Sequence, residues 1–397
     1  MNPTSISEHR AALRGLLGDG VRQTVPLDRH AAGRHLAEDL LACDDLPRFD
    51  NSAMDGYAVH PSGAEQREFV VVADVPAGAP PDVTLRPGEA ARIMTGARLP
   101  DGATAVVAVE QTDASPTGPA PGRVALTCEA ETGRHIRLRG EEVLAGSVIA
   151  PAGAPVTPGL IALARSAGCF VVTTWAPTRV AVVATGTELT DASHCAGDAG
   201  IHESNSDMIA SLCAAAGCRV TSVDTCRDDP AALTVLFDEL DRRVDVDVIV
   251  TTGGISEGAF EVVRQLGESL GTFAFTHLTM QPGAPQGLGT YGTTPVVCFP
   301  GTPVGAYVSF RMLLRPVLDA CHGSSRQEAR SAAYTGVTRR VRPGKVQFVT
   351  AVLARDGTVT AAAGRHLSAL AGADALIEVP IGAGHLVTGD TVTVHLL

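Results

Sequence analysis

The sequence is poor in aromatic residues and lacks long apolar runs, long runs of like charge and paired-cysteine motifs. Only 4% of its 397 residues are aromatic, so stacking platforms are scarce, and a formal net charge of −12 repels a polyphosphate backbone. No segment reaches the roughly 20 apolar residues that a membrane-spanning helix needs. These absences argue against a nucleic-acid partner and against a membrane span. Because Met1 to Gly20 lack the apolar core and cleavage site of a signal peptide, we expect a cytoplasmic protein.

The nine cysteines are odd in number and include no Cys-x-x-Cys pair, so they form neither a disulfide framework nor a zinc ribbon. We expect them to act as small buried hydrophobic side chains. The chain is otherwise rich in aliphatic residues and contains 42 glycines and 25 prolines. At this length the composition predicts two to four domains with aliphatic cores and many turns.

The first half of the chain combines helical and strand patterns. Apolar residues recur at helix-compatible spacing over 6–17 and again over 27–40. From 69 to 109 short apolar runs alternate with Pro and Gly clusters, which predicts a compact β domain followed by an exposed loop at 114–122. Farther along, residues 143–149 predict a strand. Pro158 to Gly168 then predict a helix that starts at proline and stops at glycine.

The second half is dominated by short, mostly apolar segments typical of buried parallel strands, at 179–184, 248–250 and 296–299. Helical stretches at 206–216 and 260–270 alternate with them. This alternation predicts a doubly wound α/β domain from about residue 177 to residue 322. After a break at 322–325, alternating segments such as 346–352 and 391–396 predict a small terminal β domain.

Polar side chains gather unusually in the segment Pro47–Ala58, which reads PRFDNSAMDGYA. Local pattern alone favours a turn, because Asp, Asn and Ser bond to nearby backbone and Asp55-Gly56 suits a positive φ. The alternative is that Asp55 is a functional carboxylate presented to a ligand.

This segment resembles the signature of the molybdopterin molybdenumtransferases, enzymes that insert molybdate into a pterin dithiolene and that also occur as the E domain of gephyrin. The resemblance covers nearly the whole chain in the family's order, through Arg92–Ala97, Thr185–Glu188, Asn205-Ser206, Asp228-Asp229, Thr251–Gly254 and Pro300-Gly301. It implies an α/β multidomain protein with a doubly wound, molybdopterin-binding-like domain. The implied domains are a discontinuous elongated N-terminal domain (1–45 and 134–176), a β-rich domain (46–133), the α/β domain (177–322) and a C-terminal, β-barrel-like domain (323–397).

The resemblance also implies the site. Glu188 and Asp228 are expected to supply carboxylates to a molybdate and Mg²⁺ site. Asp55 and Thr95 are expected to approach that site from the partner subunit, which implies a homodimer with shared active sites. The implied substrates are molybdate and molybdopterin or adenylylated molybdopterin. The other residues expected to bind substrate are Asn51, Ser52, Thr185, Gly186, Ser206, Thr252, Gly253, Gly254, Ser256, Pro300, Gly301 and Ser368.

Elementary chemistry independently favours part of this set. Ligands of open parallel sheets bind at the carboxyl ends of the strands. Three glycine-containing loops, 185–188, 251–256 and 300–303, each follow a predicted strand. Glu188 and Asp228 suit Mg²⁺, which prefers a few carboxylates and keeps several waters. Ordinary roles remain open as well. Asp228 and Asp229 can start a helix before Pro230, Glu188 can be a solvated residue of its loop, and Ser368 can be an exposed residue at a helix start.

The expected site departs from the family in two motifs. The family text Val-Ser-Val-Gly-Asp-Tyr-Asp is here Ile-Ser-Glu-Gly-Ala-Phe-Glu (255–261), and Lys-Pro-Gly-Lys-Pro is here Gln-Pro-Gly-Ala-Pro (281–285). Two lysines and one aspartate are thereby lost, the other aspartate is lengthened to glutamate, and Glu257 adds a negative charge near a helix start. Each such charge is worth on the order of 1–4 kcal/mol in a partly exposed cleft. The changed residues are Glu257, Ala259, Glu261, Gln281 and Ala284.

Two hypotheses follow. The first is an active transferase that inserts molybdate into adenylylated molybdopterin with release of AMP. The second is a catalytically impaired paralogue that keeps the fold as a pterin-binding or scaffolding protein, or that acts on another phosphorylated ligand. The intact segment from Asp50 to Tyr57 favours the first hypothesis, and the missing lysines favour the second.

Overall fold

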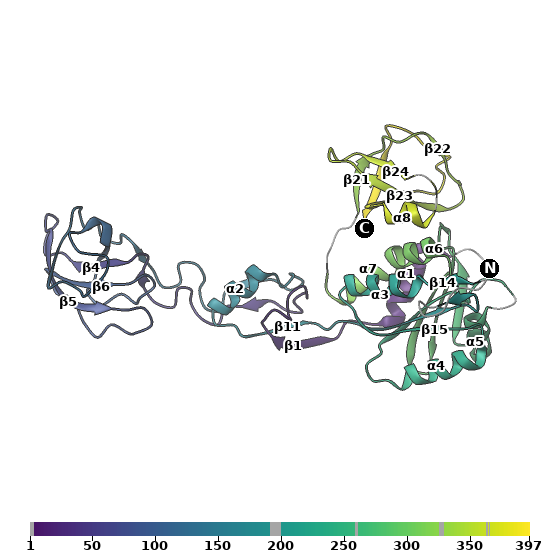
Figure 1. The fold of residues 1–397 in the computed structure, drawn as a ribbon, viewed down its shortest axis with the longest axis horizontal. Helices are drawn as coiled ribbons and strands as arrows, with labels where there is room; N and C mark the ends of the chain where they lie inside the picture. Colours follow the sequence, from purple (N-terminus) through teal and green to yellow (C-terminus); the bar gives the residue numbers. More distant parts are fainter. Residues whose placement is uncertain (1–3, 191–199, 259–260, 325–328, 363, 365) are drawn as a thin grey trace. The chain divides into compact units, whose positions relative to one another are not determined.

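A computed structural model describes residues 4–190, 200–258, 261–324, 329–362, 364 and 366–397. The chain folds into two compact units (Figure 1). Unit 1 comprises Met1–Gln23, Gly33–Ala37 and Thr174–Leu397, and unit 2 comprises Thr24–Ala32 and Glu38–Thr173. None of the described helices is long and apolar enough to cross a membrane.

A six-stranded sheet forms the centre of unit 1. In spatial order, its first four strands are parallel to one another. Each of the last two strands is antiparallel to the strand before it. The three apolar segments predicted as buried parallel strands are neighbours within it, so the predicted doubly wound fold is confirmed. In spatial order the strands are β15 (Arg219–Cys226), β12 (Arg179–Thr185), β16 (Val248–Thr252), β20 (Thr294–Phe299), β19 (Pro285–Tyr291) and β17 (Phe273–His277).

Helices cover both faces of this sheet because alternate strand residues point to opposite sides. Val180 and Val182 face one core, and Ala181 and Val183 face the other. Both faces are therefore apolar, which explains the uninterrupted hydrophobic strands. The first face is covered by α1 (Ile6–Leu17), by α3 (Asn205–Ala215) and by one continuous helix made of α6 (Pro303–Ser309), η2 (Phe310–Leu314) and α7 (Arg315–Cys321). The second face is covered by α4 (Pro230–Arg242) and α5 (Val262–Leu270) (Figure 1).

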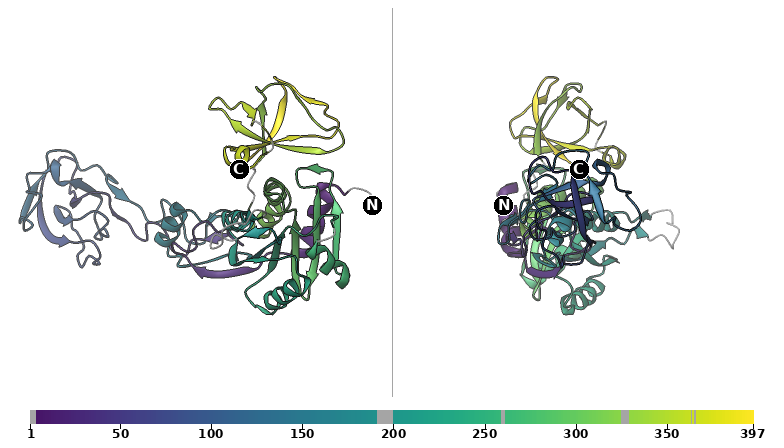
Figure 2. Two further views of the ribbon diagram at one scale, coloured as in Figure 1. Left: turned by 45° about the vertical axis from the view of Figure 1, so that its right-hand side comes forward. Right: turned by 90° about the vertical axis from the view of Figure 1, so that its left-hand side faces the viewer.

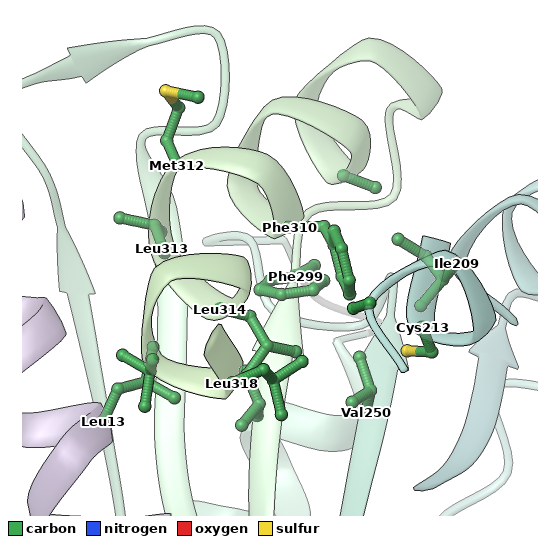
Figure 3. Close-up of a cluster of buried hydrophobic side chains, with 14 of the residues drawn as sticks. Leu13, Ile209, Cys213, Val250, Phe299, Phe310, Met312, Leu313, Leu314 and Leu318 are labelled. Carbon is green, nitrogen blue, oxygen red and sulfur yellow. The ribbon is translucent and has the colours of Figure 1, made fainter. Parts of the chain in front are cut away.

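The first core contains large aromatic and aliphatic side chains. Phe299 of β20 and Phe310 of η2 lie close to Ile209 of α3, with Leu314 and Leu318 beside them (Figure 3). All five side chains are fully buried. At about 1.5–3 kcal/mol for each large apolar side chain, this packing holds the helices on the sheet.

Helix ends follow their local sequence. The predicted helix 6–17 is confirmed, and Ser5 and Glu8 form a capping box at its start. In the other predicted helices the starts shift slightly: α3 begins at Asn205 and α5 at Val262, while Phe260 lies outside the described residues.

The C-terminal part of unit 1 is a β domain, as the alternating segments predict (Figure 2). Its core includes Tyr334, Ala351, Ile377 and Val394. One sheet has the order β18 (Met280–Gln281), β23 (Val346–Leu353), β25 (Ala375–Val379), β27 (Thr391–Leu396) and β21 (Ala329–Ala333), with β24 (Val359–Ala361) also on β23. The remaining elements are the pair β22 (Arg339–Arg340) and β26 (His385–Leu386), and the helix α8 (Leu367–Ala371).

Unit 2 contains the predicted β domain and several smaller elements. Its main sheet has the order β7 (Ala105–Ala108), β4 (Gly56–His60), β6 (Glu89–Ile93), β5 (Glu68–Val75) and β8 (Arg123–Ala125). The smaller elements are β2 (Leu40–Leu41), β3 (Asn51–Ser52), η1 (Val109–Gln111), β9 (Ile136–Arg137), β10 (Val148–Ala150) and α2 (Pro158–Ser166). A two-stranded ribbon is formed by β1 (Arg22–Pro26) and β11 (Val171–Trp175), whose residues are divided between unit 1 and unit 2.

Two secondary-structure predictions are wrong. Residues 27–40 form turns and bridges instead of a helix, because the Asp28 carboxylate accepts the His30 N–H and Gly33 adopts a φ of 82°. Leu27, Ala31 and Leu36 of that segment are still fully buried, although the backbone is not helical. Residues 143–149 contain strand only from Val148, because Gly146 makes a turn with a φ of 78°.

Gly56 is needed for close packing and not for a turn. It begins β4 and is not among the residues with a positive φ. A Cβ atom at this position would lie 2.0 Å from the Val107 carbonyl oxygen on the neighbouring strand. The turn interpretation of Asp55-Gly56 is therefore wrong for the glycine.

The substitution Gly56→Ala should lower the free energy of unfolding by about 1–3 kcal/mol, because strands β4 and β7 must separate to admit the methyl group. Gly122→Ala is the matched control, since no atom lies within 4 Å of its added Cβ. Urea denaturation of both variants measures the difference. Equal stability of the two variants would contradict the packing role.

Candidate active site

The loops that follow β12, β16 and β20 open at one edge of the unit 1 sheet. The strands are parallel and in register, with Ala184 opposite Thr252 and Thr252 opposite Phe299. The next residues along each strand therefore emerge side by side. This edge is where ligands bind in open α/β sheets.

Glycines allow these loops to pack closely. Gly253 and Gly254 have φ values of 91° and 65°. A Cβ on Gly253 would lie 2.4 Å from the Thr185 carbonyl oxygen, and a Cβ on Gly301 would lie 3.3 Å from the Gly253 Cα. Larger residues would push the three loops apart.

The adjacent residues Asp228 and Asp229 divide two tasks. Asp229 caps α4 and accepts the Ala231 N–H at 2.9 Å. Asp228 instead accepts the Thr187 N–H at 2.8 Å, and its own N–H donates to the Thr187 hydroxyl at 3.1 Å. Helix capping thus falls to Asp229, while the Asp228 carboxylate faces the loop after β12.

Glu203 organises the start of α3. Its carboxylate accepts the N–H groups of Asn205 at 2.7 Å and Ser206 at 3.0 Å, and also the Ser206 hydroxyl. A carboxylate is favourable there because the first N–H groups of a helix have no intrahelical partner. The sequence reasoning missed Glu203, although an acidic residue just before a predicted helix start was an available signal.

These loops enclose a pocket of about 480 Å³. Four carboxylates line it, those of Glu188, Glu203, Asp228 and Glu261, and no arginine or lysine is among its described lining residues. The Glu261 carboxylate accepts the Ser256 N–H at 2.8 Å. Nine of the predicted site residues line this pocket, namely Thr185, Gly186, Glu188, Asp228, Thr252, Gly253, Gly254, Ser256 and Gly301.

Two polar atoms in the pocket wall lack a partner within the described structure. They are the Asn205 Oδ1 atom and the Thr252 Oγ1 atom, on side chains that are 8% and 1% exposed. The Asn205 amide is fixed from its other end, since its Nδ2 donates to the Gly301 carbonyl at 2.7 Å. Buried polar atoms without partners are costly, so these two are suited to a polar ligand.

Several other predicted residues lie elsewhere in unit 1. Ser206 is buried and donates to Glu203, and neither Ser206 nor Pro300 is among the lining residues. Ser368 is exposed at the start of α8, where its side chain forms no cap. Of the altered positions, Gln281 and Ala284 do not line the pocket, and Ala259 lies outside the described residues.

Asp55 and Thr95 form a pair in unit 2. The Asp55 Oδ1 atom accepts the Thr95 N–H at 2.6 Å and the Thr95 hydroxyl at 2.7 Å. The backbone donor, followed by the hydroxyl, lowers the pKa of Asp55 below its usual value. Nearby, Asn51 and Ser52 are buried in β3, and the Ser52 hydroxyl donates to the Met54 carbonyl. The pair therefore presents an exposed, ionised carboxylate.

The pocket carboxylates suit a hard divalent cation. Within the described ranges, no three His, Cys, Asp or Glu side chains are grouped as a metal cluster. Glu188 and Asp228 nevertheless line the same pocket. Mg²⁺ commonly takes one or two protein carboxylates and completes its shell with water and substrate oxygens. The donor set therefore fits Mg²⁺.

The fold and pocket define a multidomain α/β protein with a small-molecule site at the carboxyl edge of its sheet. Residues 4–168 match the family model "MoeA N-terminal region (domain I and II)", and residues 181–320 match "Probable molybdopterin binding domain". A solved MoeA protein from Pyrococcus horikoshii superposes with a TM-score of 0.81 at 25% identity, covering 100% of this chain and 99% of the other.

Sequence relatives carry a more specific name. Molybdopterin molybdenumtransferase 2 of Mycobacterium tuberculosis is 39% identical over 395 residues, covering 95% of each chain. Molybdopterin molybdenumtransferase of Staphylococcus aureus is 34% identical over 270 residues, covering 66% of this chain and 62% of the other. The chain belongs to the molybdopterin molybdenumtransferase family, and the resemblance seen in the sequence is confirmed.

The substitution Thr95→Val should raise the pKa of Asp55 toward the unperturbed value of about 3.9, because one of its two donors is lost. The folded-state pKa lies below the unfolded one, so the pair stabilises the protein above the unfolded value. That contribution is lost as the pH falls through the folded-state pKa. NMR titration of the Asp55 carboxyl measures the change. Thr95→Ser keeps the hydroxyl and serves as the control, and an unshifted titration in Thr95→Val would contradict the assignment.

Proposed function

We propose that this protein is an active molybdopterin molybdenumtransferase, which inserts molybdate into adenylylated molybdopterin and releases AMP in molybdenum cofactor biosynthesis. The observation that carries the proposal is the convergence of nine expected site residues on one pocket, in a chain 39% identical to a protein of that name. The reaction suits a soluble cytoplasmic enzyme.

The pocket offers several contacts for such a substrate. Thr185, Thr252 and Ser256 bring hydroxyl groups to it, and Gly253 and Gly301 allow a ligand to approach the backbone. The unpartnered Asn205 and Thr252 oxygens would accept from ligand N–H or O–H groups. We assign binding roles there also to Gly186 and Gly254, and Pro300 is proposed to support the site from the position before the lining residue Gly301. Ser206 acts by holding the start of α3 through Glu203.

We further propose that Glu188 and Asp228 hold Mg²⁺. The bound ion would supply positive charge to substrate oxyanions, which the described pocket lining does not supply itself. Asp228 is already oriented by Thr187, so this carboxylate needs little reorganisation to accept a cation.

The Asp55–Thr95 pair completes the proposed site from the partner subunit of a homodimer. Asp55 is exposed and fixed by two short hydrogen bonds, which suits a carboxylate that must meet a substrate held elsewhere. Asn51 and Ser52 lie in the same segment and are proposed to support it. Ser368 on exposed α8 is proposed as a further contact to the substrate.

Glu188→Gln and Asp55→Asn should each reduce turnover by about 10–100-fold or more, because each keeps the shape but removes a charge from the site. Release of AMP from adenylylated molybdopterin in the presence of molybdate and Mg²⁺ is the measurement. Asp356→Asn alters an exposed carboxylate of a C-terminal turn and should leave turnover unchanged. The assignment would be refuted if both site variants kept the turnover of the wild type while all the proteins had the same melting temperature.

A second candidate function is favoured by the charge of the pocket. Four carboxylates and no described lysine or arginine disfavour a phosphorylated substrate, as expected for an impaired paralogue that only binds or scaffolds. The chain has a single lysine, Lys345, and neither Gln281 nor Ala284 retains a cation. Measured turnover of the wild-type protein separates this candidate from the first.

Glu261→Gln should tighten AMP binding by about tenfold, because it removes one repulsive charge while keeping the oxygen that accepts the Ser256 N–H. Glu268→Gln is the control, since Glu268 lies within α5, does not line the pocket and has its carboxylate 3.8 Å from the Arg264 guanidinium. Calorimetry with excess Mg²⁺ and again with a chelator measures both effects. Identical affinities for the two variants would show that the pocket charge does not limit binding.

A further inference from the structure

Two cysteines of unit 2 lie in contact. The Sγ atoms of Cys43 and Cys169 are 3.4 Å apart, and all described cysteines are free thiols. Cys43 is exposed, whereas Cys169 is 3% exposed. The expectation that the cysteines are buried hydrophobic side chains is therefore wrong for Cys43.

The backbone around this thiol pair is held on both sides. The N–H groups of Cys43 and Asp44 donate to the Ala167 carbonyl at 3.0 and 2.8 Å, and the Cys169 N–H donates to the Ala164 carbonyl at 2.8 Å. The Cys169 thiol also donates to the Leu41 carbonyl at 3.1 Å. A disulfide needs an S–S distance of about 2.05 Å, so the sulfur atoms must approach by a little over 1 Å. Side-chain rotation provides such a shift while the backbone hydrogen bonds are kept.

We propose that Cys43 and Cys169 are a redox modification site, which a hydroperoxide oxidises to a reversible intramolecular disulfide. The Cys43 thiolate attacks the peroxide oxygen, breaks the O–O bond and becomes a sulfenic acid, releasing the alcohol or water. The Cys169 sulfur then attacks the Cys43 sulfur and displaces hydroxide, which takes the Cys169 proton and leaves as water. Both thiols are oxidised and the peroxide is reduced, so the two electrons balance.

The two cysteines take different roles because their surroundings differ. Burial raises the pKa of the Cys169 thiol, so the exposed Cys43 is the sulfur that meets an oxidant first. Cys169 is the resolving thiol, which attacks the oxidised sulfur of Cys43. Among the described cysteines, Cys43 alone is exposed. Burial raises the pKa of Cys213 and Cys298, and Cys128 packs against the unit 2 β core.

The bond would enclose the part of the chain that carries Asp55 and Thr95. Cys43 and Cys169 are 126 positions apart, and the whole main sheet of unit 2 lies between them. Closing a loop of this size restricts the unfolded chain and stabilises the folded unit. This inference does not depend on the proposed enzymatic activity.

The test is controlled oxidation of the full-length protein with hydrogen peroxide, followed by intact mass spectrometry, peptide mapping and thermal melting. The wild-type protein should lose the mass of two hydrogen atoms and yield a peptide pair linked through Cys43 and Cys169. Its unit 2 melting temperature should rise by about 5–15 °C and return after dithiothreitol. Cys43→Ser and Cys169→Ser should show neither change, whereas Cys128→Ser should behave as the wild type.

Three results would overturn the inference. The first is a wild-type protein that gains oxygen instead of losing hydrogen, and the second is a cross-link that joins other cysteines. The third is a hydrogen loss that persists in Cys43→Ser. The wild-type measurement needs no variant, so a substitution that fails to fold does not obscure the outcome.

Discussion

Burial of both faces of β12, β16 and β20 is the constraint on which the rest of unit 1 depends. Helices cover each face, so these strands can expose polar groups only where they end. Their parallel register brings the three ends to one edge, and glycines such as Gly253 let the following loops meet there. The pocket is therefore a consequence of how the sheet is covered. Asp228 and Glu203 then fix the loop after β12 and the start of α3 around it.

The charge of the pocket bears on the protein's activity but not on its family membership. The pocket brings together four carboxylates with no lysine or arginine among its described lining residues, in a chain whose formal net charge is −12. An anionic ligand can bind favourably in such a pocket only together with a cation. The proposed Mg²⁺ would therefore also offset the repulsion between the ligand and the four carboxylates. The same charges give the impaired-paralogue alternative its physical basis. The family membership is secure under either account.

Much of the fold was predictable from the sequence, and the failures have specific causes. Buried strands such as 179–184 and the helix 6–17 are predictable from the spacing of their apolar residues and from their composition. The segment 27–40 has a helical period but contains Asp28 and Gly33, whose local hydrogen bonding and positive φ prevail. In the site, the βα loops were predictable because each follows a predicted strand. The different roles of Asp228 and Asp229 were not, because the role of Asp228 depends on a contact with the distant Thr187. Such contacts across 41 positions leave no local pattern.

In the proposed shared site, a pocket in unit 1 of one subunit and the Asp55–Thr95 pair in unit 2 of its partner act on one substrate. Mixing two inactive chains tests this directly, one carrying Asp55→Asn and the other Glu188→Gln. In a homodimer with shared sites, a mixed dimer contains one intact site and one doubly altered site. Co-expressed, differently tagged chains should therefore recover up to about one quarter of wild-type turnover, since half of the dimers are mixed and half of their sites are intact. Purified mixed dimers with no more activity than either parent would contradict the account.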